Sequence, residues 1–368
     1  MGRKGFRMKL DSITVKCRIP GYPAGHRIRR SIWCAFMAVM VSAGLCGCSR
    51  GFAADKTIVR IGHNQSGSHP THIALTAFEE FIEERLGSRY EVEVYPSELL
   101  GSQTDMVQLT QTGAIDFCVA SNAILETFNR NYEIFNLPYL FVNDEAYHAV
   151  MDDADITDGL FKDTVRAGFE AVTWLDAGTR NFYTVSVPVE HPADLKGLKI
   201  RVQQSPTNVE MMRLLGGSAT PMGFGDVYTA LQSKIIDGAE NNELALTNNG
   251  HGDVCKYYSY DMHQMVPDIL IGNYEFLSSL SNTEREIFEE GFKLVNEIER
   301  REWTRAVEEA KDRARTVQGV EFLYPKKQPF IDACLPLHEK ILSENPEIRP
   351  VYDAIQEYNT RYEEKDGE

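Results

Sequence analysis

Strand-like and helix-like segments alternate along most of this chain, and this alternation limits the possible folds more than any other feature. Residues 57–64, TIVRIGHN, alternate apolar and polar side chains, whereas residues 69–87 place apolar residues along one helical face before a glycine. Residues 90–96 alternate again, and residues 104–121 indicate a helix followed by a buried strand. We therefore predict an α/β protein with mixed, mostly parallel sheets covered by crossover helices.

The same order returns in the second half of the chain. The strand-like KGLKIRV, residues 196–202, precedes a helical pattern at 206–217. Residues 107–121 and 228–242 also share one order: a helix, a short apolar segment, an aspartate and small polar residues. Each should deliver a loop to the carboxyl edge of a sheet, where open α/β folds bind ligands. Two such edges facing each other would form a cleft.

A long helix is predicted after Ser281. Ser281 and Glu284 have the spacing of a capping box, and few helix breakers follow. About 35 residues of helix would be about 50 Å long. We expect this helix to brace two lobes from behind the cleft; the alternative is an arm of a coiled-coil dimer.

The first 53 residues form a basic leader. Residues 31–49 are uncharged, and the order of basic, apolar and small residues is that of a secretory signal. A permanent membrane anchor is the alternative. The sequence LCGC resembles a lipobox that would leave a lipidated Cys48 as the first residue, and GFA fits a peptidase site before Ala54. We expect a periplasmic protein, with lipid anchoring at Cys48 as one of the two processing routes.

Charge and cysteine content exclude several classes of protein. Beyond residue 53 the chain has 28 Lys/Arg against 53 Asp/Glu, a formal charge of −25, which argues against a nucleic-acid partner. Cys118, Cys255 and Cys334 have no C-x-x-C spacing, so we expect them to be small buried hydrophobic residues.

Enzyme motifs are absent from the sequence. It contains no G-x-S-x-G, no P-loop, no H-E-x-x-H and no G-x-G-x-x-G after a strand. The best metal-binding fragment is His69 with His72, which has no placed carboxylate. We therefore expect no enzyme activity, no cofactor and no metal.

Four segments in order resemble a known family: GTRNFYT, DLKGLKIRV, ATPMGFGDVYTALQSKIIDGAENN and KYYS. They are similar to the extracytoplasmic solute receptors of TRAP (tripartite ATP-independent periplasmic) transporters. The resemblance runs from about residue 57 to the C-terminus and is densest over residues 180–259. It implies two α/β lobes, hinge crossings and a long helix, which close around an organic acid without chemistry on it. It also implies membrane permease subunits as partners.

The resemblance sets expected boundaries. The leader occupies residues 1–53, and the lobes are lobe I at 55–178 with 267–306, and lobe II at 179–266 with 307–368. We expect a monomer.

Two arginines carry the predicted site. In the family, the arginine of the KGLKIRV motif makes a two-bonded salt bridge with the ligand carboxylate, and that position here is Arg201. A guanidinium suits this role because its planar fork matches a carboxylate and stays charged when desolvated. A strand-end arginine paired with a surface acid is the alternative. Arg180 matches a second family arginine, with a salt bridge between the lobes as its alternative.

The resemblance adds six positions to the site: Asn241, Asn242, Phe224, Asn64, Asn122 and Gln103. We also expect His69 and Asp268 in the site, where each would bond a hydroxyl group of the ligand. Plain core packing is the alternative for Phe224, a helix N-terminus facing water for His69, and a structural hinge bond for Asp268. Gln103 stands where relatives often have an acid.

These groups indicate the ligand class. Two arginines require one anionic end, while several amides and an acid suit hydroxyl groups, which both donate and accept. The best match is a uronate such as glucuronate or galacturonate, and the sequence ENN at Asn242 resembles receptors for sugar acids. The alternatives are a receptor for a C4-dicarboxylate or another carboxylate, and a ligand-sensing periplasmic protein.

Overall fold

The computed structural model describes residues 56–366. Its first sheet contains five strands in the order β2-β1-β3-β10-β4. The bounds are β1 (Thr57–Gly62), β2 (Tyr90–Tyr95), β3 (Phe117–Ser121), β4 (Phe169–Leu175) and β10 (Asp268–Asn273). β1 pairs in parallel with β2 and β3, whereas β10 runs antiparallel to β3 and β4. The predicted signal segment, Cys48 and Ala54 lie outside the described residues.

The helices of the first sheet have defined caps, and α2 ends at the glycine that the sequence predicts. The helix α2 (Pro70–Leu86) begins with proline and ends at Gly87. In α3 (Gln103–Thr112), Ser102 and Asp105 form a capping box and Gly113 ends the helix at a φ of 71°. Between β3 and β4 lie α4 (Asn122–Leu125), η1 (Arg130–Asn136), α5 (Asp144–Met151), α6 (Ala154–Asp163) and η2 (Thr164–Ala167).

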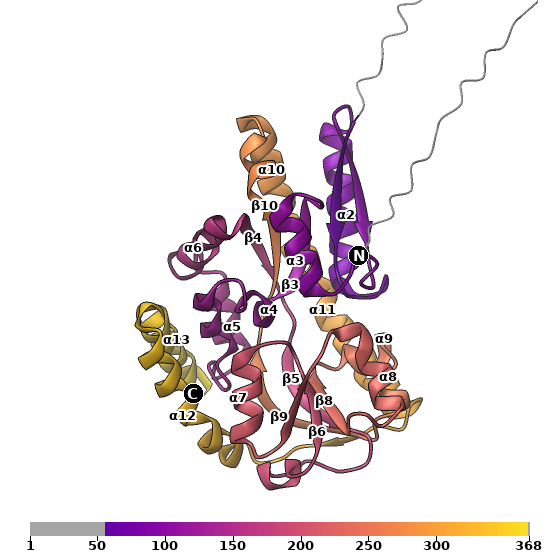
Figure 1. Cartoon of the computed structure of the whole chain (residues 1–368), viewed down its shortest axis with the longest axis vertical. Helices are drawn as coiled ribbons and strands as arrows, with labels where there is room; N and C mark the ends of the chain where they lie inside the picture. The colour runs from indigo at the N-terminus through magenta and orange to yellow at the C-terminus, as the bar shows by residue number, and fades with distance from the viewer. Residues whose placement is uncertain (1–55, 367–368) are drawn as a thin grey trace, which may run out of the picture. The chain divides into compact units, whose positions relative to one another are not determined.

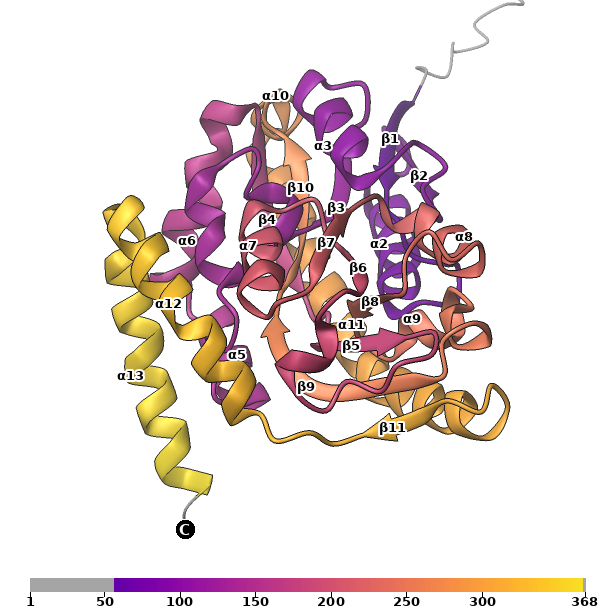
Figure 2. The same ribbon diagram turned by 60° about the horizontal axis from the view of Figure 1, so that its bottom comes forward.

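The second sheet contains six strands in the order β11-β9-β5-β8-β6-β7. Its strands are β5 (Thr179–Thr184), β6 (Lys199–Val202), β7 (Ser218–Pro221), β8 (Gly238–Asn241), β9 (Tyr257–Met265) and β11 (Glu321–Leu323). Figure 2 shows β11 beside β9, with which it pairs in parallel at the edge. Over both sheets, five of the nine described pairings are parallel, which confirms the mixed, mostly parallel prediction.

Short helices connect the strands of the second sheet. They are η3 (Pro192–Leu195), α7 (Pro206–Leu214), η4 (Phe224–Asp226), α8 (Val227–Gln232), α9 (Leu244–Asn248) and η5 (His251–Asp253). The predicted order of strand, helix, strand between residues 196 and 241 is therefore confirmed, with Arg201 on β6 and the ENN sequence at the end of β8.

The chain crosses between the sheets at two short connections, residues 176–178 and residues 266–267. In the first, Gly178 has a φ of 59°, which only glycine adopts readily, and a Cβ there would meet Trp303 at 2.9 Å. After α10 (Tyr274–Ser279) comes the predicted long helix, α11 (Asn282–Thr316), with the Ser281–Glu284 capping box in place. α11 contacts α2 and β4 of the first sheet and α9 near the second, so it spans both (Figure 1).

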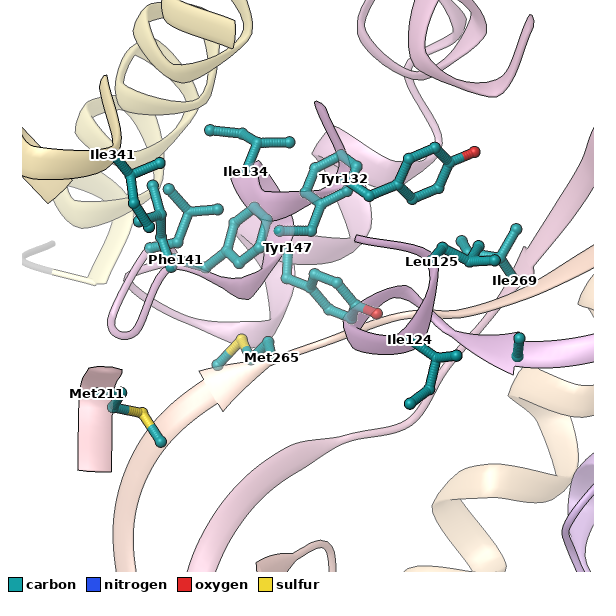
Figure 3. Packing of buried hydrophobic residues seen from close by; sticks show 14 of the residues in the cluster. Ile124, Leu125, Tyr132, Ile134, Phe141, Tyr147, Met211, Met265, Ile269 and Ile341 are labelled. Atoms are coloured by element: carbon teal, nitrogen blue, oxygen red, sulfur yellow. The ribbon is translucent and has the colours of Figure 1, made fainter. Parts of the chain in front are cut away.

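The chain ends in α12 (Gln328–Glu344), η6 (Pro346–Ile348) and α13 (Arg349–Asp366). α12 packs against α7 and α13 against α5, so the two helices reach elements that belong to different sheets (Figure 1). One apolar core joins these parts, and Figure 3 shows a portion that includes Met211 of α7, Met265 of β9 and Ile341 of α12. The predicted lobe boundaries remain a prediction.

The three described cysteines are free and buried, as expected. Burial raises the pKa of the Cys118 thiol to about 12, so it stays protonated. None of the helices within residues 56–366 has both the length and the apolar character needed to cross a membrane.

Candidate ligand-binding site

A cavity lies between the two sheets, and both predicted carboxyl edges contribute to it. The empty space among its residues is about 480 Å³, part of it continuous with solvent. Both sheets and their connecting loops supply the lining: Asn64, Gln65, Glu98, Gln103, Ile124, Ala177, Arg180, Arg201, Gln203, Gln204, Met222, Gly223, Phe224, Asn241, Asn242 and Asp268. Eight of the ten predicted site residues are in this set. Asn122 and His69 are not.

Arg201 is a buried cation that makes no ion pair among the described residues. It lies on β6 with 3% of its surface exposed. Its Nε and Nη2 donate to the carbonyl of Met222 at 3.2 and 2.9 Å, and no carboxylate of residues 56–366 forms an ion pair with it. The Phe224 ring lies 5.7 Å from its Cζ. Burial lowers the pKa of Arg201, and the charges of Glu240 and Glu98 oppose part of this shift, while the guanidinium stays charged. No carboxylate of residues 56–366 contacts Arg201 directly, so the guanidinium can form a close ion pair with a ligand.

Arg180 differs because its charge already has a partner. Its Nε donates to Oε2 of Glu240 at 2.5 Å and its Nη2 to the Glu240 carbonyl at 2.8 Å. Its Nη1 donates to Oδ1 of Asn241 at 3.0 Å. Both ion-pair partners are almost fully buried, and Glu240 lies on β8, the strand next to β5 in the same sheet. The ion pair is therefore internal to the second sheet and does not join the two sheets.

Glu240 also faces a buried histidine. Nε2 of His263 lies 3.5 Å from Oε2 of Glu240, and Nδ1 of His263 lies 2.7 Å from Oδ2 of Asp261. Burial lowers the pKa of His263, but the carboxylates of Asp261 and Glu240 outweigh it and raise the pKa to about 9. Burial raises the pKa of Glu240, but Arg180 and His263 outweigh it and hold the pKa at about 2. Glu240 is thus ionised and interacts with two cations, Arg180 and His263. Arg201, in contrast, lines the cavity and forms no ion pair with a carboxylate of residues 56–366.

The two asparagines at the end of β8 have different surroundings. Oδ1 of Asn241 accepts from Arg180 and from the backbone N–H of Asn242, so the amide nitrogen is the group that Asn241 can offer to a ligand. Asn242 donates from Nδ2 to the carbonyl of Ala177 at 2.9 Å and accepts from the N–H of Leu244 at 3.0 Å. Asn242 therefore holds the end of β8 against the first crossing.

Asp268 begins β10, directly after the second crossing, and lines the cavity. Burial raises the pKa of Asp268 to about 6, and the positive charge of Arg180 opposes part of this rise. At neutral pH the side chain is therefore mostly an acceptor-only carboxylate.

Three amide side chains, Asn64, Gln65 and Gln103, lie in the wall on the side of the first sheet. Oδ1 of Asn64 is buried and has no hydrogen-bond partner among residues 56–366. Gln103 begins α3 and accepts from the N–H of Ser121 at 3.3 Å. A buried acceptor without a partner usually marks a place for water or a ligand.

Asn122 and His69 lie outside the cavity lining, and both make structural bonds. Nδ2 of Asn122 donates to the carbonyl of Tyr132 and to Asn136 at 2.7 and 2.8 Å. His69 is the N-cap of α2, where Nδ1 accepts from the N–H of Thr71 at 3.2 Å, and burial lowers its pKa to about 3. His69 is 2% exposed, so the structure contradicts the alternative of a side chain facing water.

Sequence reasoning did not identify several lining residues, notably Glu98, Gln203 and Gln204. The two glutamines directly follow β6, and Glu98 follows β2, so the rule that ligands bind beyond the carboxyl ends of strands would have found all three. Among the described residues no group of three or more His, Cys, Asp or Glu side chains is arranged to hold a metal ion.

A family of known proteins matches most of this chain. The model of the bacterial extracellular solute-binding proteins, family 7, matches residues 61–345. The chain is a family 7 solute-binding protein. This family 7 protein is also 38% identical over 305 residues to protein YiiZ of Salmonella typhimurium, a match that covers 83% of this chain and 93% of that protein.

Solved structures extend the comparison. The TRAP periplasmic solute-binding protein of Anaerococcus prevotii, with bound α/β-D-glucuronate, has a TM-score of 0.83 and 65% identity, over 83% of this chain and 99% of that chain. The protein of Sulfitobacter sp. NAS-14.1, with bound β-D-galacturonate, has a TM-score of 0.79 and 28% identity, over 82% and 100%. The family 7 solute-binding protein described here therefore has the two-lobe TRAP receptor fold, and the predictions of fold and receptor class are confirmed.

Proposed function

We propose that this solute-binding protein binds a uronate, such as D-glucuronate or D-galacturonate, in the cavity between its sheets. The observation that carries the proposal is Arg201, a buried cation without a carboxylate partner among residues 56–366. A ligand carboxylate would supply the missing charge, and burial makes such an ion pair specific for an anion of matching geometry. The similar proteins solved with glucuronate and galacturonate support this choice of ligand.

The remaining polar groups of the cavity favour a polyhydroxylated ligand. Asn241 offers an amide nitrogen, Asn64 an unpartnered oxygen and Asp268 a carboxylate. Hydroxyl groups satisfy donors and acceptors alike, whereas a second carboxylate can only accept. A C4-dicarboxylate would need a second free cation, and the charge of Arg180 is already neutralised by Glu240. The uronate is therefore favoured over the dicarboxylate.

The protein would act as a receptor without chemistry on its ligand, and would pass the acid to the membrane permease subunits of a TRAP transporter. We propose that the lobes comprise residues 55–178 with 267–306, and 179–266 with 307–368. They would close by bending at the two crossings. In this proposal the eight predicted residues of the lining contact or surround the ligand, while Asn122 and His69 support the site from outside it.

The test is a calorimetric and thermal-shift comparison of D-glucuronate and D-galacturonate with succinate and D-glucose. A ligand that binds only the folded protein at 100 times its Kd adds about 2.7 kcal/mol of stability. The uronates should therefore raise the Tm by about 4 °C, since about 1 kcal/mol shifts the Tm of a protein of this size by about 1.5 °C. The same titrations with Arg201→Lys should show weaker uronate binding, and Arg213→Lys is the matched control because Arg213 is exposed and paired with Glu210. A larger response to succinate would reverse the ranking, and a response to glucose but not to glucuronate would overturn the role of Arg201.

A further inference from the structure

Glu98 lies in the loop between β2 and α3, and the backbone holds it over the cavity. Both Ser97 and Glu98 have a φ of 57°, the left-handed region that residues other than glycine rarely adopt. The N–H groups of Ser97 and Glu98 donate to the carbonyls of Gln65 and His63 at 2.9 and 3.1 Å. The strained loop is thus fixed to the residues that follow β1, and strain of this kind concentrates at functional sites.

The two oxygens of the Glu98 carboxylate have different surroundings. Oε2 accepts from the N–H of Gly225 at 3.1 Å, across the cavity from η4 of the second sheet. Oε1 is buried and has no hydrogen-bond partner among residues 56–366. A buried carboxylate oxygen left unpaired is costly, so a donor is missing at this position.

The chemistry of the cavity limits what that donor can be. Arg201 is close enough to influence Glu98 electrostatically, but its Nε and Nη2 are held by Met222. A ligand carboxylate on Arg201 would itself be an acceptor, and could not satisfy Oε1. A hydroxyl group of the same ligand can donate to it.

We propose that Glu98 is a specificity-determining residue with two roles. Through Oε2 and the N–H of Gly225 it fastens the two walls of the cavity together. Through Oε1 it accepts a hydrogen bond from a ligand hydroxyl, and so selects hydroxylated acids over acids without hydroxyl groups. The inference rests on the proposed function, because it assumes that Arg201 holds the ligand carboxylate.

Gly225 offers an independent way to displace the carboxylate. A Cβ at position 225 would overlap Oε2 of Glu98, whereas the backbone φ of Gly225 is not in the left-handed region. Gly225→Ala should therefore push the Glu98 carboxylate out of place while its charge remains. Glu98→Gln differs again, because the amide oxygen can still accept from Gly225 but the free acceptor becomes an N–H₂ group.

The experiment measures Kd by calorimetry for D-glucuronate and for tetrahydropyran-2-carboxylate, which has the ring ether and carboxylate without the hydroxyls. Glu98→Ala should weaken glucuronate binding by about 10- to 100-fold, the value of one hydrogen bond to a charged group. Gly225→Ala should weaken glucuronate binding by the same factor, and Glu98→Gln should weaken it several-fold. Binding of tetrahydropyran-2-carboxylate should change much less in all three. Glu91→Gln, an exposed acid on β2, is the matched control and should bind like the wild type.

The outcomes separate the inference from the proposed function. No glucuronate binding by the folded wild type overturns the proposed function and the inference together. Wild-type glucuronate affinity in Glu98→Ala, or in Glu98→Gln, overturns the inference alone. An equal loss for both ligands shows that Glu98 only fastens the cavity and does not select the ligand. Circular dichroism confirms folding, and Gly225→Ala provides the test if Glu98→Ala does not fold.

Discussion

The two buried arginines of the cavity should respond differently when their charge is removed. Arg180 forms an ion pair with Glu240 in the second sheet, and both side chains are almost fully buried. Arg201 is equally buried but has no carboxylate partner among residues 56–366. Arg180→Met should therefore destabilise the ligand-free protein, whereas Arg201→Met should leave it close to wild-type stability and abolish ligand binding.

The magnitudes follow from the partners that each substitution leaves behind. Removing one member of a buried ion pair costs about 3 to 5 kcal/mol. His263 remains 3.5 Å from Glu240, so we expect the lower end, about 3 kcal/mol, for Arg180→Met. Arg201→Met loses two hydrogen bonds that share the Met222 carbonyl, worth about 1 kcal/mol each, but it also removes a buried charge without a counter-ion. These effects oppose each other, so the net change should be within about 1.5 kcal/mol.

Thermal unfolding without ligand is the assay, followed by calorimetric titration with D-glucuronate. At about 1.5 °C per kcal/mol, the Tm of Arg180→Met should fall by about 4 to 5 °C, and that of Arg201→Met should change by about half as much or less. Arg213→Met, at an exposed pair, controls for the loss of one positive charge. Equal losses of Tm in the two variants would refute the distinction between a structural and a ligand-binding arginine.

Three further predictions follow from the same contacts. Arg201→Lys should weaken glucuronate binding by about 10- to 100-fold in calorimetry, because an ammonium lacks the planar fork; wild-type affinity would show that no two-bonded contact exists. The folded pKa of His263 is raised to about 9, so its stabilising effect is complete below pH 6.5 and is lost as the pH rises towards 9. The Tm difference between wild type and His263→Gln should shrink over that interval, and a constant difference would contradict a charged His263. Burial raises the pKa of Glu299 well above its usual range, so Glu299 is protonated in the folded protein and ionises on unfolding above about pH 4.5, which lowers the stability. Glu299→Gln should therefore raise the Tm at pH 8 more than at pH 4.5. The opposite order would show that Glu299 is ionised in the folded protein.

The local sequence predicted the elements that carry their own signals. α2 ends at the predicted Gly87, and α11 begins with the predicted Ser281 capping box. These signals act over three or four residues, so a single sequence contains them. Arg201 was predicted from its motif, and its burial without a carboxylate partner in the described residues supports the predicted role without testing it.

Contacts between residues far apart in the sequence account for the features of the site that the sequence did not predict. Nothing local indicates that Arg180 would be neutralised by Glu240, 60 residues away, or that His263 would share that carboxylate. The N–H partner of Glu98 lies 127 residues along the chain. His69, expected in the site, caps α2 by accepting from the N–H of Thr71 and lies outside the cavity lining.

The sequence by itself determined the α/β alternation, the long helix, the receptor family and the arginine on β6, because periodicity, caps and motifs depend on neighbouring residues. Only the tertiary structure decided which of two similar arginines keeps its charge available for a ligand. Burial and the approach of Glu240 set the charge balance at Arg180, while Arg201 donates to the carbonyl of Met222 and makes no ion pair among residues 56–366. Electrostatic compensation depends on distance in space, and that distance exists only once the two sheets have formed.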